Sequence, residues 1–195
     1  MTQRMSSVER KKEIMASALE IIYKEGFPNL TIRNIADSIG ISEAAIYRHF
    51  NSKKEIVAKL ADIVFNQNQL KITDNDIADP FELLKKIMVK QVKILEERPF
   101  LTSILFQEGI FAEYPDIKKK FNTHRKKNEN IIKEIIEVAK EKGLILSELD
   151  PEVFSVLYMG SLRVVVLKWR SADFSYSLEK KVNKIIKQLF EFIKK

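Results

Sequence analysis

Apolar residues recur at helical spacing through almost the whole chain, and no segment shows the sustained alternation of a β-strand. Glycine and proline, the residues that most often interrupt helices, number only five each among 195 residues. Helix-start signals recur as well, at Ser6-x-x-Glu9, Ser52-x-x-Glu55, Asp79-Pro80 and Asp150-Pro151. The sequence therefore predicts an all-α protein of about nine helices. The predicted helices cover residues 7–24, 31–39, 43–50, 53 into the sixties, 80–97, 100–112, 115–142, 151–171 and 177–194.

Residue usage argues against several kinds of enzyme site. The chain has no cysteine, which excludes disulfides, thiolate zinc sites and cysteine nucleophiles. Its two histidines, His49 and His124, show no metal-ligand spacing, and no glycine-rich phosphate loop is present. We therefore expect no enzyme, no metal and no cofactor, although a helical enzyme whose site assembles from distant residues remains an alternative.

The chain also lacks the segments that direct proteins to membranes. Its longest uncharged stretch, Val153 to Leu162, has ten residues, about half of what a membrane-spanning helix needs. The N-terminus has no apolar signal segment. We expect a cytoplasmic protein without membrane contact. The polar stretch 66–79 predicts a boundary between an N-terminal domain, 1–65, and a larger helical domain, 66–195.

Residues 30–50 predict a helix-turn-helix. Thr31 can cap a first helix, and Gly40 follows where a tight turn needs a positive φ angle. Ala36 is small where the second helix must approach closely. The apolar stripe that faces the core consists of Ile32, Ile35, Ala36 and Ile39. A plain helical hairpin within an all-α protein is the alternative, but Ser52-Lys53-Lys54-Glu55 adds cations at the start of the next helix, where a phosphate can bind.

The segment resembles the DNA-binding domain of TetR-family (TetR/AcrR) transcriptional regulators. The matching residues are Gly26, Phe27, Thr31, Ile35, Ala36, Gly40, Ile41, Ser42, Tyr47, His49, Phe50, Lys53 and Ile56. The resemblance spans about 50 residues at fixed spacing, whereas the rest of the chain matches only in length and helicity. It implies a homodimer with one three-helix DNA-binding domain per subunit and a larger ligand-binding and dimerisation domain. Such a protein is usually a repressor that a small molecule releases from a palindromic operator.

The resemblance assigns several residues to the DNA backbone. Thr31 would cap its helix and bond a phosphate, and Arg33 would reach base edges or a phosphate. Tyr47, His49 and Lys53 would hold the backbone. Each also has a structural interpretation, because Tyr47 can be a packing aromatic, His49 a satisfied hydrogen-bonding group and Lys53 a solvated residue at a helix start.

A second group of residues would face the major groove. Ser42, Glu43, Ala44 and Ala45 begin the recognition helix. Glu43 could accept from a cytosine amino group, and the alanines could contact thymine methyl groups. Arg48 stands where the family often has a second aromatic, so its role in DNA binding follows less directly.

The last two predicted helices, 151–171 and 177–194, are apolar around much of their circumference. A helix that is apolar all round is buried on two sides, which favours a core on one side and a partner subunit on the other. Gly160 would allow close approach there. The resemblance also implies a four-helix interface between subunits, while a central core helix in a monomer is the alternative.

A ligand site is predicted in the larger domain from polar and aromatic residues on apolar helix faces. Buried polar groups must be paired, either with another side chain or with a ligand. Arg163 could neutralise an anionic effector or lie at the rim of the dimer, and the aromatic residues could line a cavity or form ordinary core. The candidates favour a largely hydrophobic effector with a carboxylate or thioester head. They are Phe106, Phe111, Tyr114, Phe121, His124, Asn128, Tyr158 and Arg163.

The net charge of +7 does not by itself indicate DNA binding. Residues 1–65 contain 10 basic and 8 acidic residues, so most of the excess lies in the remaining 24 and 19. A few placed residues therefore carry the DNA-binding prediction. The leading hypothesis is a dimeric, ligand-responsive repressor, and the alternative is a DNA-binding architectural factor without an effector.

Overall fold

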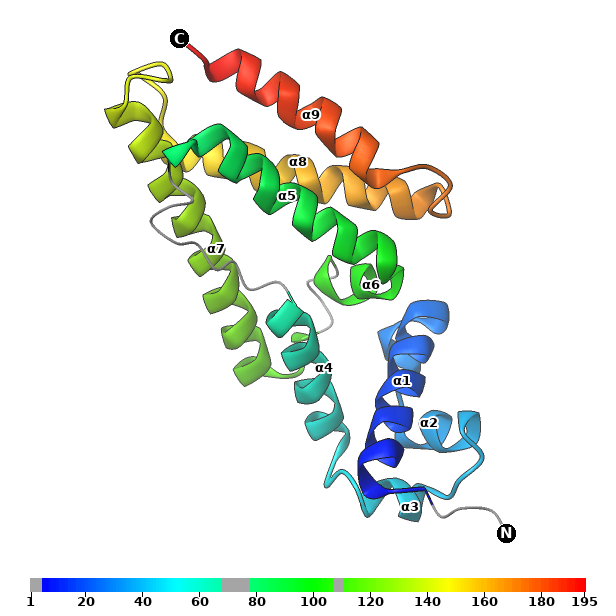
Figure 1. The fold of residues 1–195 in the computed structure, drawn as a ribbon. Coiled ribbons are helices and arrows are strands. Elements are labelled where there is room, and N and C mark those ends of the chain that lie inside the picture. Colours follow the sequence, from blue (N-terminus) through cyan, green and yellow to red (C-terminus); the bar gives the residue numbers. More distant parts are fainter. Residues whose placement is uncertain (1–4, 68–77, 107–110) are drawn as a thin grey trace. The chain divides into compact units, whose positions relative to one another are not determined.

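The computed structural model describes residues 5–67, 78–106 and 111–195, and most of these residues are helical (Figure 1). The all-α prediction is confirmed, because the described residues form nine α-helices and no β-strand. The helices are α1 (Ser7–Glu25), α2 (Ile32–Ser38), α3 (Glu43–Tyr47), α4 (Lys53–Gln67), α5 (Pro80–Glu97), α6 (Thr102–Leu105), α7 (Pro115–Glu141), α8 (Pro151–Ser171) and α9 (Leu178–Ile193).

Two predicted helices are shorter than expected. The predicted helix 43–50 ends at Tyr47, because the amide of His49 donates to the carbonyl of Ile46 (2.9 Å) in a tightened last turn. The predicted helix 100–112 is replaced by the 3₁₀-helix η3 (Pro99–Leu101) and the short α6. Residues 107–110 of that prediction lie outside the described residues.

The chain divides into two compact units, which we describe separately. The first unit combines Met1–Gln67 with Phe100–Lys119, and the second combines Asn68–Pro99 with Lys120–Lys195. The predicted domain boundary falls in residues 66–79, of which 68–77 lie outside the described ranges.

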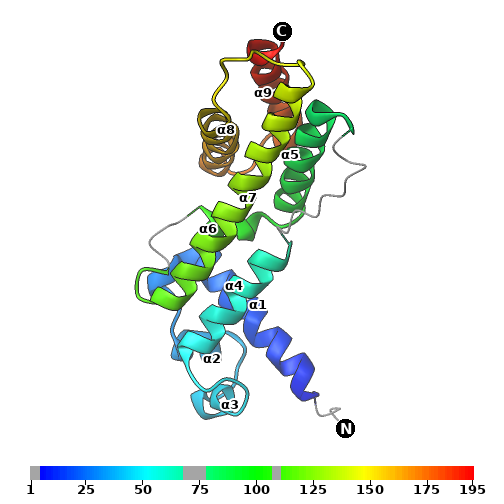
Figure 2. The same ribbon diagram turned by 90° about the vertical axis from the view of Figure 1, so that its left-hand side faces the viewer.

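The core of the first unit forms where α1 packs against α2 and α4 (Figure 2). The predicted stripe on α2 is confirmed in large part, since Ile32, Ile35 and Ala36 are buried and Ile39 is half-buried. Other buried residues of this core are Ile14, Ala18, Ile22, Leu30, Ile46, Phe50, Ile56, Val57 and Leu60. The side-chain hydroxyls of Ser17 and Ser38 share a hydrogen bond between α1 and α2.

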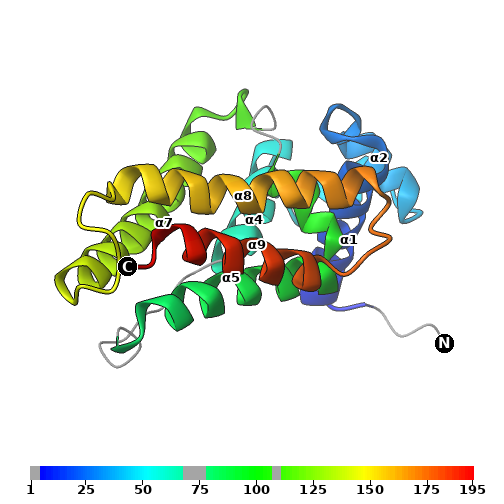
Figure 3. The same ribbon diagram turned by 90° about the horizontal axis from the view of Figure 1, so that it is seen from above.

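In the second unit, α5, α9 and α8 lie side by side, with α9 against both other helices (Figure 3). Phe81 of α5 and Phe190 of α9 meet edge to face with ring centroids 5.0 Å apart. The Glu96 carboxylate accepts from the Ser177 hydroxyl (3.3 Å) and the Glu179 amide (3.2 Å), which joins the end of α5 to the start of α9. No helix within the described ranges is long and apolar enough to cross a membrane.

Candidate nucleic-acid interface

Side-chain caps and one glycine define the helix-turn-helix. The Thr31 hydroxyl accepts from the amide of Asn34 (3.0 Å) at the start of α2, as the sequence predicted. The Ser42 hydroxyl accepts from the amide of Ala45 (3.2 Å) and caps α3. Between them Gly40 has φ 67°, a conformation that favours glycine. The two caps fix where α2 and α3 begin, and Gly40 allows the chain to turn between them.

The recognition helix α3 is anchored by one side and free on the other. Ile46 is completely buried, whereas Tyr47 leaves half of its surface exposed. Ser42, Glu43, Ala44 and Arg48 are exposed as well. Ala45 is half-buried, so it contributes less surface to this face than its neighbours. In Figures 1 and 2, α3 lies next to α2 within the first unit.

Arg33 projects from the first turn of α2 into solvent. Its Nε atom lies 3.8 Å from an oxygen of Asp37, one turn further along the helix, and both side chains are more than two-thirds exposed. Exposed pairs of this kind contribute little stability, so the guanidinium is available to an incoming base or phosphate.

His49 connects the end of the recognition segment to α1. Its Nδ1 atom and the Ser7 hydroxyl lie 3.2 Å apart. The start of α1 is itself fixed by the predicted capping box, in which Ser6 and Glu9 bond each other's backbone amides. His49 thus has a structural partner, and a phosphate contact would share the imidazole with Ser7.

Two aromatic residues that match the family pattern, Phe27 and Phe50, make cation–π contacts with lysines. The Lys53 ammonium lies 5.2 Å from the centroid of the Phe27 ring, and the Lys11 ammonium lies 5.8 Å from that of Phe50. Phe27 also meets Tyr114 edge to face, with ring centroids 6.4 Å apart. The pKa of Tyr114 is raised, mainly because the phenol is partly buried and to a smaller extent because the Glu113 carboxylate lies nearby. Cation–π contacts hold lysines at defined places on a surface.

The start of α4 differs in one detail from the prediction. The Ser52 hydroxyl accepts from the amide of Glu55 (3.2 Å), as a capping box requires. The Glu55 carboxylate, however, accepts from the backbone and side-chain amides of Asn51 (2.8 and 3.0 Å) and not from Ser52. The predicted box is therefore displaced by one residue, because the carboxylate reaches the residue that precedes the cap.

Lys54 is one of the two cations at this helix start, and the family resemblance assigns it no role in DNA binding. Its ammonium lies 2.8 Å from an oxygen of Asp116, in the first turn of α7. The two residues are 62 positions apart, so no local pattern signals the pair. The adjacent lysines at the start of α4 were the only available signal.

The predicted ligand residues fall into two sets. Phe106, Phe111 and Tyr114 belong to the first unit, and the others belong to the second. On α7, His124 Nε2 and Asn128 Nδ2 lie 3.4 Å apart, so these two polar groups contact each other. Phe121 and Arg163 are half-buried.

Tyr158 occupies a core position. It is buried, and its hydroxyl donates to the carbonyl of Leu84 (2.6 Å). This arrangement matches the ordinary core position that was the alternative to lining a cavity for the aromatic candidates.

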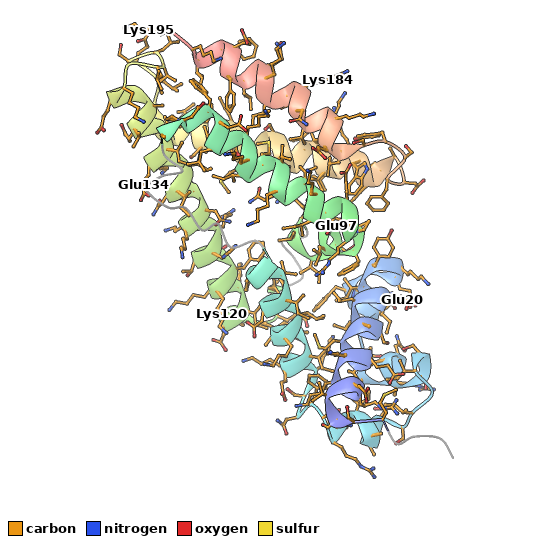
Figure 4. All side chains as sticks on the ribbon, viewed as in Figure 1. Glu20, Glu97, Lys120, Glu134, Lys184 and Lys195 are labelled. Carbon is orange, nitrogen blue, oxygen red and sulfur yellow. The ribbon has the colours of Figure 1, made fainter. Side chains whose placement is uncertain are left out.

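A shallow groove of about 300 Å³ runs along α9 and contains none of the predicted ligand residues. Its lining combines lysines with apolar side chains, and Lys184 is labelled in Figure 4. The lining residues are Lys181, Lys184, Ile185, Gln188, Leu189 and Phe192.

Comparison with known protein families distinguishes a DNA-binding regulator from a helical enzyme. The sequence profile described as bacterial regulatory proteins, tetR family, matches residues 14–60, and the profile of the YsiA-like protein C-terminal region matches residues 46–192. The chain belongs to the TetR family of transcriptional regulators. It is therefore a regulator with a helix-turn-helix DNA-binding domain, and its family and structural neighbours are not enzymes.

Individual relatives of this TetR-family chain are distant. The nucleoid occlusion factor SlmA from Vibrio cholerae is 23% identical over 172 residues, which cover 87% of this chain and 88% of SlmA. The ketosteroid regulator KstR2 from Mycobacterium tuberculosis has the same fold, with TM-score 0.77, 21% identity and coverage of 99% and 97%. FadR from Bacillus subtilis, solved with stearoyl-CoA, gives TM-score 0.72, 22% identity and coverage of 92% and 97%.

Proposed function

We propose that this TetR-family regulator is a homodimeric repressor that binds a palindromic operator and leaves it when a largely hydrophobic ligand binds. The observation that carries the proposal is the exposed face of α3, held outward by the buried Ile46 and by the Ser42 cap. A short helix with small exposed residues at its start fits the major groove.

In this proposal some residues of the α2–α4 segment bind the DNA backbone and others approach the bases. Tyr47, Lys53 and Thr31 contact the phosphate backbone, which fixes the register without reading sequence. Arg33 and the exposed start of α3 approach the base edges. Arg48 and His49 lie beside the last turn of α3, where backbone phosphates pass a bound recognition helix.

The dimer is proposed to form through α8 and α9. The outward face of α8 carries Val156, which is 62% exposed, and Val164, which is 52% exposed; Phe192 of α9 is 73% exposed. Large exposed apolar side chains that recur along one helix face favour an interface. The same face of α8 includes Val153, Leu157, Gly160 and Leu167. Apart from the neighbouring turns of α8 itself, no atom of the described residues lies within 4 Å of a methyl group added at Gly160, so the helix surface there is open.

We further propose that the effector is an acyl thioester or a similar hydrophobic acid. FadR from Bacillus subtilis was solved with stearoyl-CoA, and KstR2 is named a ketosteroid regulator, so two proteins of this fold are associated with hydrophobic compounds. Within the second unit, Phe121 and Arg163 supply aromatic surface and a positive charge of the kind that such a ligand needs.

The similarity to SlmA favours a second candidate function. A nucleoid occlusion factor need not respond to a metabolite, so the chain could act as a DNA-binding architectural factor without an effector. The two candidates share the DNA interface and differ only in whether a small molecule weakens DNA binding. Both functions act on DNA in the cytoplasm.

A binding experiment separates these candidates. Fluorescence anisotropy at physiological salt would compare DNA fragments from around the coding gene with a random duplex, with and without fatty acids, acyl thioesters and aromatic cations. Specific binding that one compound abolishes supports the repressor. Specific binding that no compound changes favours the architectural factor, and equal binding to every fragment contradicts both.

A further inference from the structure

The ion pair between Lys54 and Asp116 joins the start of α4 to the start of α7 within the first unit. Lys54 is the second residue of α4 and directly follows Lys53, a predicted DNA-backbone contact. Asp116 is the second residue of α7. Two adjacent lysines, Lys53 and Lys54, therefore begin α4, the helix after the recognition helix, and the carboxylate of Asp116 binds the ammonium group of Lys54.

Contacts around the pair bring the start of α7 to this place. Tyr114, just before α7, lies edge to face on Phe27, and Phe27 carries the Lys53 ammonium on its ring. The two lysines therefore have different partners in the free protein. Lys53 rests on a neutral ring that leaves its charge available, whereas Lys54 is neutralised by a carboxylate at 2.8 Å.

The exposure of the pair indicates that it contributes little to the stability of the fold. The Lys54 side chain is 55% exposed and that of Asp116 is 77% exposed. Solvent and salt screen such a pair, so it is easily exchanged for another ionic contact. A DNA phosphate offers the same charge-assisted hydrogen bond to an ammonium as a carboxylate does, and it also releases condensed counterions.

We infer that Lys54 is an additional DNA-backbone ligand that the Asp116 carboxylate occupies in the free protein and that a DNA phosphate displaces. Asp116 therefore lowers the affinity for DNA by competing with phosphate for the same ammonium. Because Asp116 belongs to the first turn of α7, any displacement of this helix start changes how available Lys54 is. The inference rests on the proposed DNA-binding role of α2, α3 and α4.

Salt-dependent binding to a random-sequence duplex tests the inference, because a phosphate contact needs no particular operator. Each phosphate contact contributes about 0.9 to the slope of log affinity against log salt. We expect Lys54→Gln to reduce the slope by about that amount. We expect Asp116→Asn to raise affinity about two- to fivefold at low salt, as loss of an exposed competing pair allows, and to give no such gain when combined with Lys54→Gln.

Glu113→Gln is the matched control, since it removes one exposed carboxylate three residues away and leaves the pair intact. Its effect should be the same with and without Lys54. An unchanged slope in Lys54→Gln, or an equal gain from Asp116→Asn in both backgrounds, overturns the inference alone. A lower thermal midpoint together with weaker binding in Asp116→Asn also overturns it, because the pair would then be a structural clamp. A wild-type chain that binds no DNA overturns the proposed function as well.

Discussion

The hydroxyl of Tyr158 donates a 2.6 Å hydrogen bond to the backbone carbonyl of Leu84 and so connects α8 with α5 inside the second unit. The phenol is buried, so the bond replaces the water that an exposed hydroxyl would have. Tyr158 is thereby a structural link between two helices that are distant in sequence.

Replacing this tyrosine should therefore destabilise the fold without removing much volume. We expect Tyr158→Phe to lower the free energy of unfolding by about 1 kcal/mol, the usual net contribution of one hydrogen bond. Urea unfolding followed by circular dichroism would measure it, with Tyr47→Phe as a control at an exposed tyrosine. If the variant kept wild-type stability but lost effector binding, Tyr158 would be a ligand contact instead.

The same side chain predicts a dependence of stability on alkaline pH. Burial raises the pKa of the Tyr158 phenol in the folded state, while in the unfolded chain it titrates near about 10. The unfolded state therefore loses this proton first, and the contribution of Tyr158 is complete below about pH 10 and declines above it. The stability advantage of wild type over Tyr158→Phe should fall by about 1.4 kcal/mol per pH unit above that value, so a difference of about 1 kcal/mol disappears and then reverses within about one pH unit. A constant difference from pH 8 to 11 would contradict this.

The exposed face of α8 should be sensitive to charge if a second subunit covers it. We expect Val156→Glu to weaken self-association by about 30-fold or more, the loss typical of a central interface residue. Sedimentation velocity over a range of concentrations would show the shift toward monomer. Leu144→Glu provides the control, because Leu144 is also an exposed apolar residue of the second unit but lies outside α8 and α9. Equal effects of both substitutions would remove α8 from the interface.

DNA binding should separate backbone residues from base-reading residues. We expect Tyr47→Ala and Lys53→Ala to weaken binding to all sequences, and Lys53→Ala to lower the salt slope by about 0.9. Arg33→Ala should also alter the sequence preference, with a change of about 1–3 kcal/mol at one base pair. Binding at several salt concentrations would measure the slope, and selection from a randomised duplex pool would measure the sequence preference. A uniform loss across sequences in Arg33→Ala would assign Arg33 to the backbone.

Local signals explain why most helix bounds were predictable. The start of α5 follows from Asp79, whose carboxylate accepts from the amides of Phe81 and Glu82 (both 3.1 Å). The start of α8 follows in the same way from Asp150. Caps and turns depend on neighbours within four residues, so the sequence contains all of the information they need.

Contacts between distant residues were not predictable in this way. The Lys54–Asp116 pair, the Lys11–Phe50 contact and the Tyr158–Leu84 bond each depend on how helices are placed in space. The ligand candidates show the same difficulty, since an apolar helix face does not reveal whether its polar residues meet each other, as His124 and Asn128 do. The positions predicted to contact DNA and ligand stay predictions until they are tested in binding experiments.

Gly160 links the stability of one chain to the assembly of two. A glycine in the middle of a helix costs about 1 kcal/mol relative to alanine, and no other helix in the described part of the chain comes within 4 Å of a methyl group placed there. Gly160→Ala should therefore raise the thermal midpoint of the isolated chain and at the same time hold a partner helix further away. If two α8 helices cross there, one added methyl group widens the dimer at its axis and alters the spacing of its two recognition helices. A residue that contacts neither DNA nor ligand would then determine which operator length the protein accepts.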